Sequence, residues 1–197
     1  DLHSFPTRRS SDLNRSQGYG GERMSIISQN NRITSFVIDR THDYIMYDTT
    51  DLVCAIGFPR QVVGLSLKDD EFHLSLFVVR EEYGFDEAGY GRLEQVSCQA
   101  GAAMTTQPEL TGDFLKLKDD VTGRETIIVL VRWDELETWR DAIRELIPQA
   151  EFIIPHITLY TNQKGALGYS DRHRDRVRVL DDAVVTTLRN ILLRSKS

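Results

Sequence analysis

Two short stretches of the chain repeat one pattern; they read Phe72-His73-Leu74-Ser75-Leu76-Phe77 and Pro155-His156-Ile157-Thr158-Leu159-Tyr160. Each stretch runs histidine, apolar residue, hydroxyl residue, apolar residue, aromatic residue. Side chains in a β-strand point alternately to its two faces, so each stretch would present an imidazole and a hydroxyl on one face. At the rise of a strand, these two polar groups would lie about 6.5 Å apart. The pattern therefore predicts two strands with matching polar faces.

An imidazole with a nearby hydroxyl suits the cleavage of a phosphodiester at a ribose 2′ oxygen. One group must accept a proton and another must donate one, and an imidazole with a free pKa of about 6.5 does either near neutral pH. The hydroxyls would donate hydrogen bonds to the non-bridging phosphate oxygens. A zinc site at His73 and His156 would need a third ligand, and no His-Glu-x-x-His pattern or cysteine pair supplies one. We therefore expect metal-independent chemistry, without a cofactor.

The two stretches resemble the paired His-x-Ser/Thr motifs of the 2H phosphoesterase superfamily, which includes LigT-like and other cyclic phosphodiesterases. His73 and His156 are 83 residues apart, and the family's motifs are about eighty residues apart. The second stretch resembles the family's C-terminal motif. A downstream segment resembles a glycine-bearing loop of some bacterial members, and it reads Lys164-Gly165-Ala166-Leu167-Gly168-Tyr169-Ser170.

This resemblance implies an α+β, bilobal 2H phosphoesterase-like fold, with two antiparallel-sheet lobes around a central cleft and flanking helices. It implies that His73 and His156 are the acid–base pair, and that Ser75 and Thr158 hold the phosphate. The expected substrate is a 2′,3′-cyclic, 2′-5′ or other cyclic nucleotide or RNA-end phosphodiester. Which histidine first acts as the base is left open by the sequence.

Three further residues are candidates for binding the substrate. Tyr160 and Phe77 have the same strand parity as the motif histidines, so either could stack on a base. The alternatives are a tyrosine at the rim of the site and a phenylalanine of the core. Lys164 could close over a phosphate together with the glycine-bearing loop, or it could simply be solvated, as charged side chains usually are.

Two other interpretations compete with the enzyme. A non-catalytic nucleotide or RNA-end binding module would use the same cleft and leave its ligand intact. A purely structural α+β domain would need neither histidine in a site, because a single His-x-Ser/Thr strand is often structural. That last interpretation predicts histidines that lie far apart or are buried.

The rest of the pattern predicts a mixture of strands and helices, which is typical of the α+β class. The clearest helix covers 134–146, where apolar residues recur at steps of three and four. The other expected elements are two strands between 33 and 47, irregular structure or two short pieces at 49–67, a strand at 72–79, a loop at 82–92, a short helix at 93–104, a hairpin from 110–117 and 126–132, a strand at 152–161 and a terminal helix at 176–193.

Charge and composition limit the partners. The chain has 197 residues and a formal net charge of −6, which argues against coating long duplex DNA. We therefore expect a small nucleotide, a cyclic oligonucleotide or an RNA terminus as the partner, and a monomer. The sequence contains no run of about 18 apolar residues, so it predicts no membrane-spanning helix. Cys54 and Cys98 are too few for a disulfide framework and indicate a cytoplasmic protein.

The first residues differ in character from the rest. Residues 1–13 resemble the in-frame translation of a sequencing adapter, and residues 14–23 read as a translated leader before Met24. We therefore expect 1–23 to be a non-native or disordered leader, and 24–197 to be a single bilobal 2H phosphoesterase-like domain. Without residues 1–23, the remaining 174 residues would carry a net charge of −7.

Overall fold

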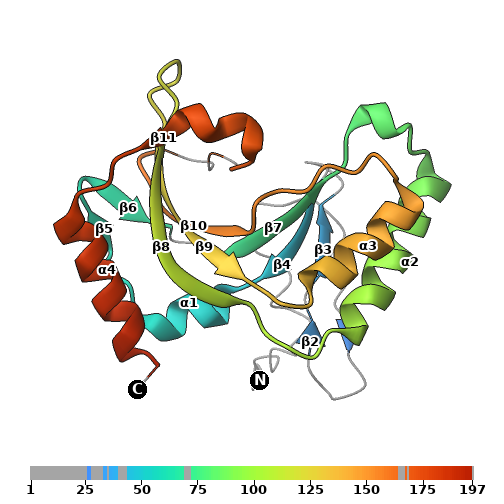
Figure 1. The fold of residues 1–197 in the computed structure, drawn as a ribbon, viewed down its shortest axis with the longest axis horizontal. Coiled ribbons are helices and arrows are strands. Elements are labelled where there is room, and N and C mark those ends of the chain that lie inside the picture. The colour runs from blue at the N-terminus through green and yellow to red at the C-terminus, as the bar shows by residue number, and fades with distance from the viewer. Residues whose placement is uncertain are drawn as a thin grey trace, which may run out of the picture.

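The fold combines four α-helices with a nine-stranded antiparallel sheet and a separate two-stranded sheet, within the part of the chain that is described (Figure 1). It is seen in a computed structural model, which describes residues 26–27, 33–34, 36–39, 44–68, 72–163, 167 and 169–196. The α+β class is thereby confirmed. The expected leader, 1–23, lies outside the described residues.

The elements follow one another with short connections. In chain order they are β1 (Ile26–Ile27), β2 (Ile33–Thr34), β3 (Phe36–Asp39), β4 (Tyr44–Asp48), α1 (Thr50–Ile56), β5 (Gln61–Val62), β6 (Leu65–Leu67), β7 (His73–Val78), a 3₁₀ turn (Glu81–Tyr83), α2 (Glu87–Ala103), β8 (Glu109–Lys118), β9 (Glu125–Arg132), α3 (Leu136–Leu146), β10 (His156–Thr161), a second 3₁₀ turn (Asp171–Arg176), β11 (Val177–Arg178) and α4 (Asp182–Arg194).

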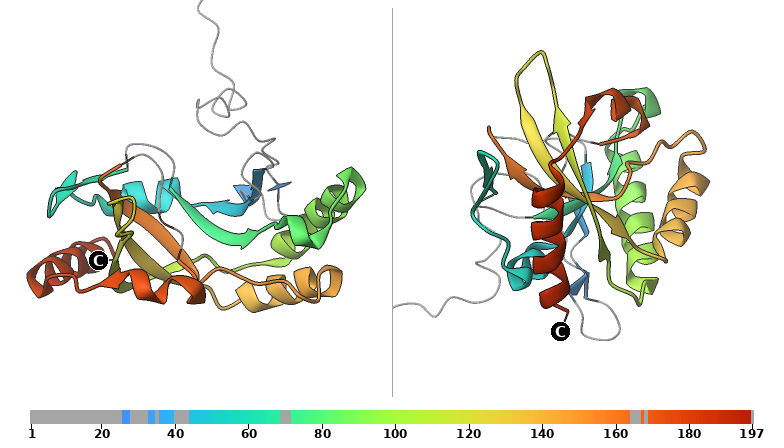
Figure 2. Two further views of the ribbon diagram at one scale, coloured as in Figure 1. Left: turned by 90° about the horizontal axis from the view of Figure 1, so that it is seen from above. Right: turned by 60° about the vertical axis from the view of Figure 1, so that its left-hand side comes forward.

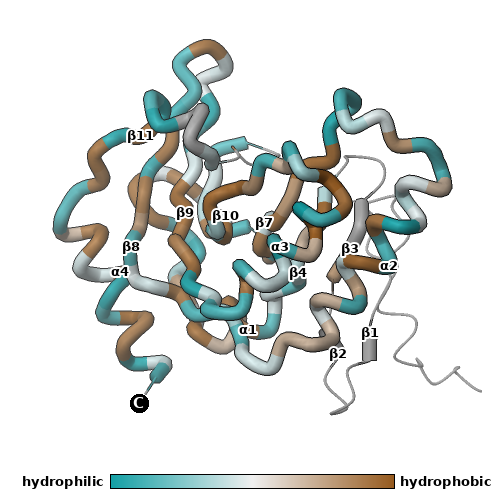
Figure 3. Tube along the Cα trace, turned by 45° about the vertical axis from the view of Figure 1, so that its right-hand side comes forward, coloured by the Kyte–Doolittle hydropathy of each residue, from teal (hydrophilic) through white to brown (hydrophobic). Residues whose placement is uncertain are grey.

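The strands of the large sheet run in the order β11-β8-β9-β10-β7-β4-β3, and β6 of the β5–β6 hairpin also pairs with β10. The hairpin expected from 110–117 and 126–132 is present as β8 and β9. The central strands β7 and β10 are the two that carry the repeated motif, and their apolar residues make these strands mostly brown in Figure 3.

Residues of all four helices share one main core with the large sheet, and we call the face of the sheet toward this core the helix face. The main core contains Val53 of α1, Leu93 of α2, Trp139 of α3 and Leu188 of α4. The sheet contributes Leu74 to this core, together with Ile45, Tyr47, Ile127, Val129, Ile157 and Leu159. Figures 1 and 2 show α2 and α3 beside β3, β4 and β7, and α4 beside β8 at the other end.

Several boundaries differ from the sequence prediction, each for a local reason. The segment 49–67, predicted to be irregular or to form two short pieces, contains α1, which ends at Gly57 in a left-handed conformation, and then the short β5–β6 hairpin. The predicted loop at 82–92 contains the start of α2, because the Asp86 side chain caps the helix by accepting a hydrogen bond from Gly89 N at 2.7 Å. The terminal helix begins at Asp182 rather than near 176, where Asp181 caps it by accepting from Ala183 N.

The helices in the described part of the chain are all too short or too polar to cross a membrane.

Candidate active site

The two motif strands are direct neighbours in the sheet. β10 pairs with β7 in antiparallel orientation, and Ile157 lies opposite Leu74. Continuing this register by one residue in each direction places Thr158 opposite His73 and His156 opposite Ser75. Residues opposite each other share a face, so both histidines and both hydroxyls lie on the face away from the helices. We call this side of the sheet the motif face.

Standard sheet geometry sets the spacing of these four side chains. Directly opposed residues have Cβ atoms about 4.5–5.5 Å apart, and diagonal neighbours such as His73 and His156 lie about 7–8 Å apart. A phosphate between the two imidazoles would therefore be within reach of both rings and of both hydroxyls.

The start of β7 is anchored to the start of α1. Thr49 N donates to Phe72 O at 2.9 Å, and Phe72 N donates to Thr50 Oγ1 at 2.9 Å. These bonds fix the residue directly before His73. The His73 side chain is half-buried, and Asp48 of β4 lies opposite it. The Asp48 carboxylate accepts a hydrogen bond from Thr50 N at 2.9 Å.

His156 has an enclosed and well-defined environment. Its exposed fraction is 3%, and its Nδ1 lies 2.7 Å from the carbonyl oxygen of Ile154. A carbonyl oxygen only accepts hydrogen bonds, so Nδ1 carries the proton and Nε2 of the neutral ring carries the lone pair. Burial disfavours the charged ring and lowers the pKa of His156, although the bond to Ile154 opposes that effect. His156 is thus disposed to be a neutral base.

The neighbours of His156 are mainly apolar. Leu130 of β9 lies opposite it, and the Tyr169 ring meets the imidazole edge-on, with centroids 6.1 Å apart and planes at 83°. Thr158 is also buried, with an exposed fraction of 8%, and lies opposite Ile128. The structural interpretation expected histidines that are buried or far apart. His156 is buried, whereas the two histidines lie on adjoining strands.

Each motif strand contains a β-bulge directly after its hydroxyl residue. On β7, Met46 of β4 pairs with Ser75 and Ile45 pairs with Phe77, so Leu76 is the extra residue. On β10, Ile128 of β9 pairs with Thr158 and Ile127 pairs with Tyr160, so Leu159 is the extra residue. An extra residue reverses the alternation of faces beyond it.

The bulges make two expectations from the sequence wrong. Phe77 does not share the face of His73; it is fully buried in the main core, stacked on Tyr83 with centroids 5.8 Å apart. Tyr160 does not share the face of His156; it is fully buried in the same core, and its hydroxyl donates to Pro59 O at 2.9 Å. Both aromatic rings pack in the main core, behind the motif face.

Part of the predicted glycine-bearing loop lies over the motif face. Leu167 is buried against Leu117 and Ile128 in a second, small core, and Tyr169 packs against the same group. The remaining candidate, Lys164, lies outside the described residues, as do 165, 166 and 168. The structure thus brings together His73, Ser75, His156 and Thr158, and adds Tyr169 beside them.

Compared with known proteins, the chain matches no family model, and no curated protein or solved structure matches it. The geometry of the motif face is therefore the basis for a functional conclusion. Among the described side chains, no group of three or more His, Cys, Asp or Glu residues is arranged to hold a metal ion.

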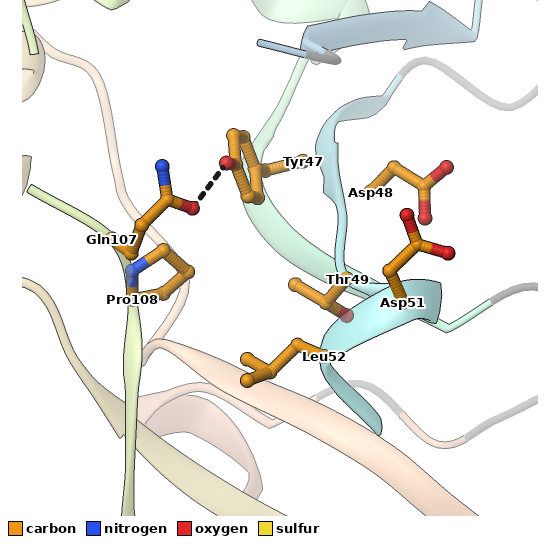
Figure 4. A pocket seen from close by; sticks show the side chains of 7 residues that line it. All are labelled: Tyr47, Asp48, Thr49, Asp51, Leu52, Gln107 and Pro108. Atoms are coloured by element: carbon orange, nitrogen blue, oxygen red, sulfur yellow. Dashed lines mark hydrogen bonds between the residues drawn. The ribbon is translucent and has the colours of Figure 1, made fainter. Parts of the chain in front are cut away.

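A separate hollow of about 280 Å³ lies at the end of β4 (Figure 4). Its lining includes no motif histidine or hydroxyl, although Asp48 is the strand neighbour of His73. The Tyr47 hydroxyl donates to Gln107 Oε1 at 3.0 Å on its wall. The other lining residues are Thr49, Asp51, Leu52 and Pro108.

Two neighbours of the histidines, Asp48 and Tyr169, are not marked as individual site residues by the local sequence. Asp48 directly follows a predicted strand, and its position opposite His73 depends on the pairing of β4 with β7. Tyr169 was recognised only as part of a loop, and its contact with His156 depends on how that loop packs on β8 and β9. The aromatic residue shortly after the second motif was the available signal for Tyr169.

Proposed function

We propose that the protein is a metal-independent phosphodiesterase of the bilobal 2H type, acting on a 2′,3′-cyclic, 2′-5′ or other cyclic nucleotide or RNA-end phosphodiester in the cytoplasm. One observation carries the proposal: Ile157 lies opposite Leu74. In that register, both histidines and both hydroxyls share one face of two adjoining strands. The β7–β10 junction would form the floor of the cleft. One lobe would contain β3, β4 and β7 with α2 and α3, and the other β8–β11 with α1 and α4.

The surroundings of the two histidines favour a division of their roles. His156 Nε2, with its lone pair, would take the proton from the attacking water as the new bond between oxygen and phosphorus forms. His73, half-buried and opposite Asp48, would donate its proton to the leaving ribose oxygen as the old bond between phosphorus and oxygen breaks. Exchange of protons with water then restores both rings.

The hydroxyls would stabilise the charge that develops on phosphate. In the register set by Ile157 and Leu74, Ser75 would lie beside His156 and Thr158 beside His73, so each imidazole would have a hydroxyl donor from the other strand. Donors aimed at the non-bridging oxygens before the reaction begins lower the barrier, because they need no rearrangement in the transition state.

Turnover of a panel of 2′,3′-cyclic nucleotides, 2′-5′ oligonucleotides and cyclic oligonucleotides tests this proposal. The wild type should hydrolyse at least one class, with and without a chelator, and rate against pH should be bell-shaped. His73→Ala and His156→Ala should each lose turnover while keeping a cooperative unfolding transition. His173→Ala, a histidine outside both motifs, is the matched control and should retain activity. Full activity in both motif variants would falsify the proposal.

A second candidate is a non-catalytic binding module for nucleotides or RNA ends, which would use the same motif face and leave its ligand intact. The same panel separates it from the enzyme, because a binder would retain a ligand and release it chemically unchanged. Product analysis after incubation with stoichiometric protein distinguishes retention from slow turnover.

A further inference from the structure

Tyr169 covers an imidazole that no other described aromatic ring contacts. Its ring meets His156 edge to face, with centroids 6.1 Å apart. Two residues earlier, Leu167 is buried against Leu117 and Ile128, which fixes this part of the segment to the sheet. The contact therefore belongs to a packed region.

The neighbouring strands flank the other sides of His156. Leu130 lies on the β9 side, and Nδ1 is bound to the Ile154 carbonyl. On the β7 side, the register of Ile157 and Leu74 sets Ser75 opposite His156 and His73 diagonal to His156. The β7 side, where His73 lies, is therefore the side of His156 from which a phosphate shared by the two histidines would approach.

Few charged or titratable groups share this part of the motif face. On β7 there is His73, and beyond it on β4 there is Asp48, which is opposite His73 rather than His156. On β9, Leu130 and Ile128 are uncharged, and Arg132 comes at the end of the strand, where it pairs with Glu109. The covering segment contributes the Tyr169 phenol. Burial, rather than a neighbouring charge, is thus the main influence on His156.

We infer that Tyr169 is a positioning residue for His156: its ring holds the imidazole in place and excludes water from it. This inference rests on the proposed function. The ring, rather than the phenol hydroxyl, performs this role, because the contact is made by the two ring systems.

Removing the ring would admit water to the imidazole. Burial lowers the pKa of His156, so exposure should return that pKa toward the free value of about 6.5. A base with a higher pKa is protonated over a wider range of acidic pH. The acidic limb of the rate profile should therefore move to higher pH in Tyr169→Ala and stay in place in Tyr169→Phe.

Two measurements test the inference. Proton–carbon NMR of the imidazole C–H groups follows the titration of His156 directly and needs no substrate. Kinetics against pH, on whichever substrate of the panel is active, follow the same group in the reaction. The variants are Tyr169→Ala, Tyr169→Phe and Tyr169→Leu, with Tyr90→Ala on α2 as a control that removes a partly buried ring from elsewhere.

The expected result is a titration midpoint and an acidic limb that both rise by at least about half a pH unit in Tyr169→Ala, with Tyr169→Leu between it and the wild type. Tyr169→Phe and Tyr90→Ala should match the wild type within error. An unchanged His156 titration in Tyr169→Ala overturns the inference, even where turnover confirms the enzyme. A shifted titration in a protein that turns over no substrate overturns the proposed function and leaves the contact of Tyr169 with His156 established.

Discussion

Ile157 of β10 lies opposite Leu74 of β7, and this pair determines which side chains of the two motifs meet. The strands run in opposite directions, so the histidine of each motif faces the hydroxyl of the other. Continued by one residue in each direction, this register sets His73 opposite Thr158 and His156 opposite Ser75. A phosphate at this place would contact an imidazole from one strand and, beside it, a hydroxyl from the next.

The hydroxyls should matter for kcat. Thr158→Val preserves the shape of the side chain and removes its donor, and Ser75→Ala removes the other. Each should lower kcat roughly 100-fold or more, the usual loss when one preorganised donor to a transition-state oxygen is deleted. Steady-state kinetics on an active substrate of the panel would measure it. Thr187→Val on α4, whose hydroxyl donates to Ala183 O, is the control and should stay near the wild-type rate. A Thr158→Val protein with unchanged kcat would remove this residue from the site.

The alternation of residues predicted the motif strands well, but it failed after the hydroxyl in both of them. Strict alternation puts Phe77 with His73 and Tyr160 with His156. The extra residues, Leu76 and Leu159, are ordinary buried leucines, and nothing in their own sequence marks a bulge. A bulge exists only relative to a partner strand, so its position depends on a register that the local sequence does not contain.

The start of α2 is a second feature that the local sequence did not predict. Gly89 and Gly91 favoured a loop, yet both lie inside α2. At Gly89 an added Cβ would come within 2.5 Å of the Phe85 ring, so this glycine allows the start of the helix to pack closely. The prediction of a helix at 134–146 agreed with α3 because its amphipathic spacing is strong, and the stacking of Trp139 on Phe36 of β3 reinforces it.

Tyr160 provides a test of the bulge in β10. Its hydroxyl donates to Pro59 O in a buried place, and burial raises its pKa well above the ordinary value. Tyr160→Phe should therefore reduce the free energy of unfolding by about 0.5–1.5 kcal/mol, the usual net value of one hydrogen bond. Urea denaturation measures the loss, and kcat should be unchanged because the ring faces away from the motif face. A large loss of kcat at unchanged stability would instead return Tyr160 to the site.

Val63 offers a gain in stability at the tip of the β5–β6 hairpin. It has φ of +44° and precedes Gly64 with φ of +79°, so a β-branched residue occupies a left-handed position of a two-residue turn. Asn-Gly is the preferred pair in such a turn. Val63→Asn should stabilise the protein by about 1 kcal/mol, which raises Tm by about 2–4 °C for a chain of this size. Val121→Asn, at an exposed hairpin tip without positive φ, should change Tm little; equal gains in both variants would point to solubility instead of strain.

Glu135 should make stability depend on acid pH. Its carboxylate accepts hydrogen bonds from the backbone N–H and the hydroxyl of both Thr105 and Thr106, at 2.7–2.8 Å. These bonds, the Thr106 backbone bond first, lower the pKa of Glu135 from 4.5 to about 2. A depressed carboxyl pKa stabilises the fold fully above the unfolded value of 4.5, and this contribution is lost as pH falls toward 2.

Glu135→Gln should therefore be less stable than the wild type at pH 7, and the difference should shrink as pH falls from about 4.5 to about 2. Urea midpoints measured at intervals across this range give the comparison. Glu145→Gln removes the same charge from an exposed position of α3 and is the matched control. Its pH dependence should follow that of the wild type. If Glu135→Gln and the wild type lose stability in parallel over this range, the four hydrogen bonds do not hold the loop at 105–106 as the structure indicates.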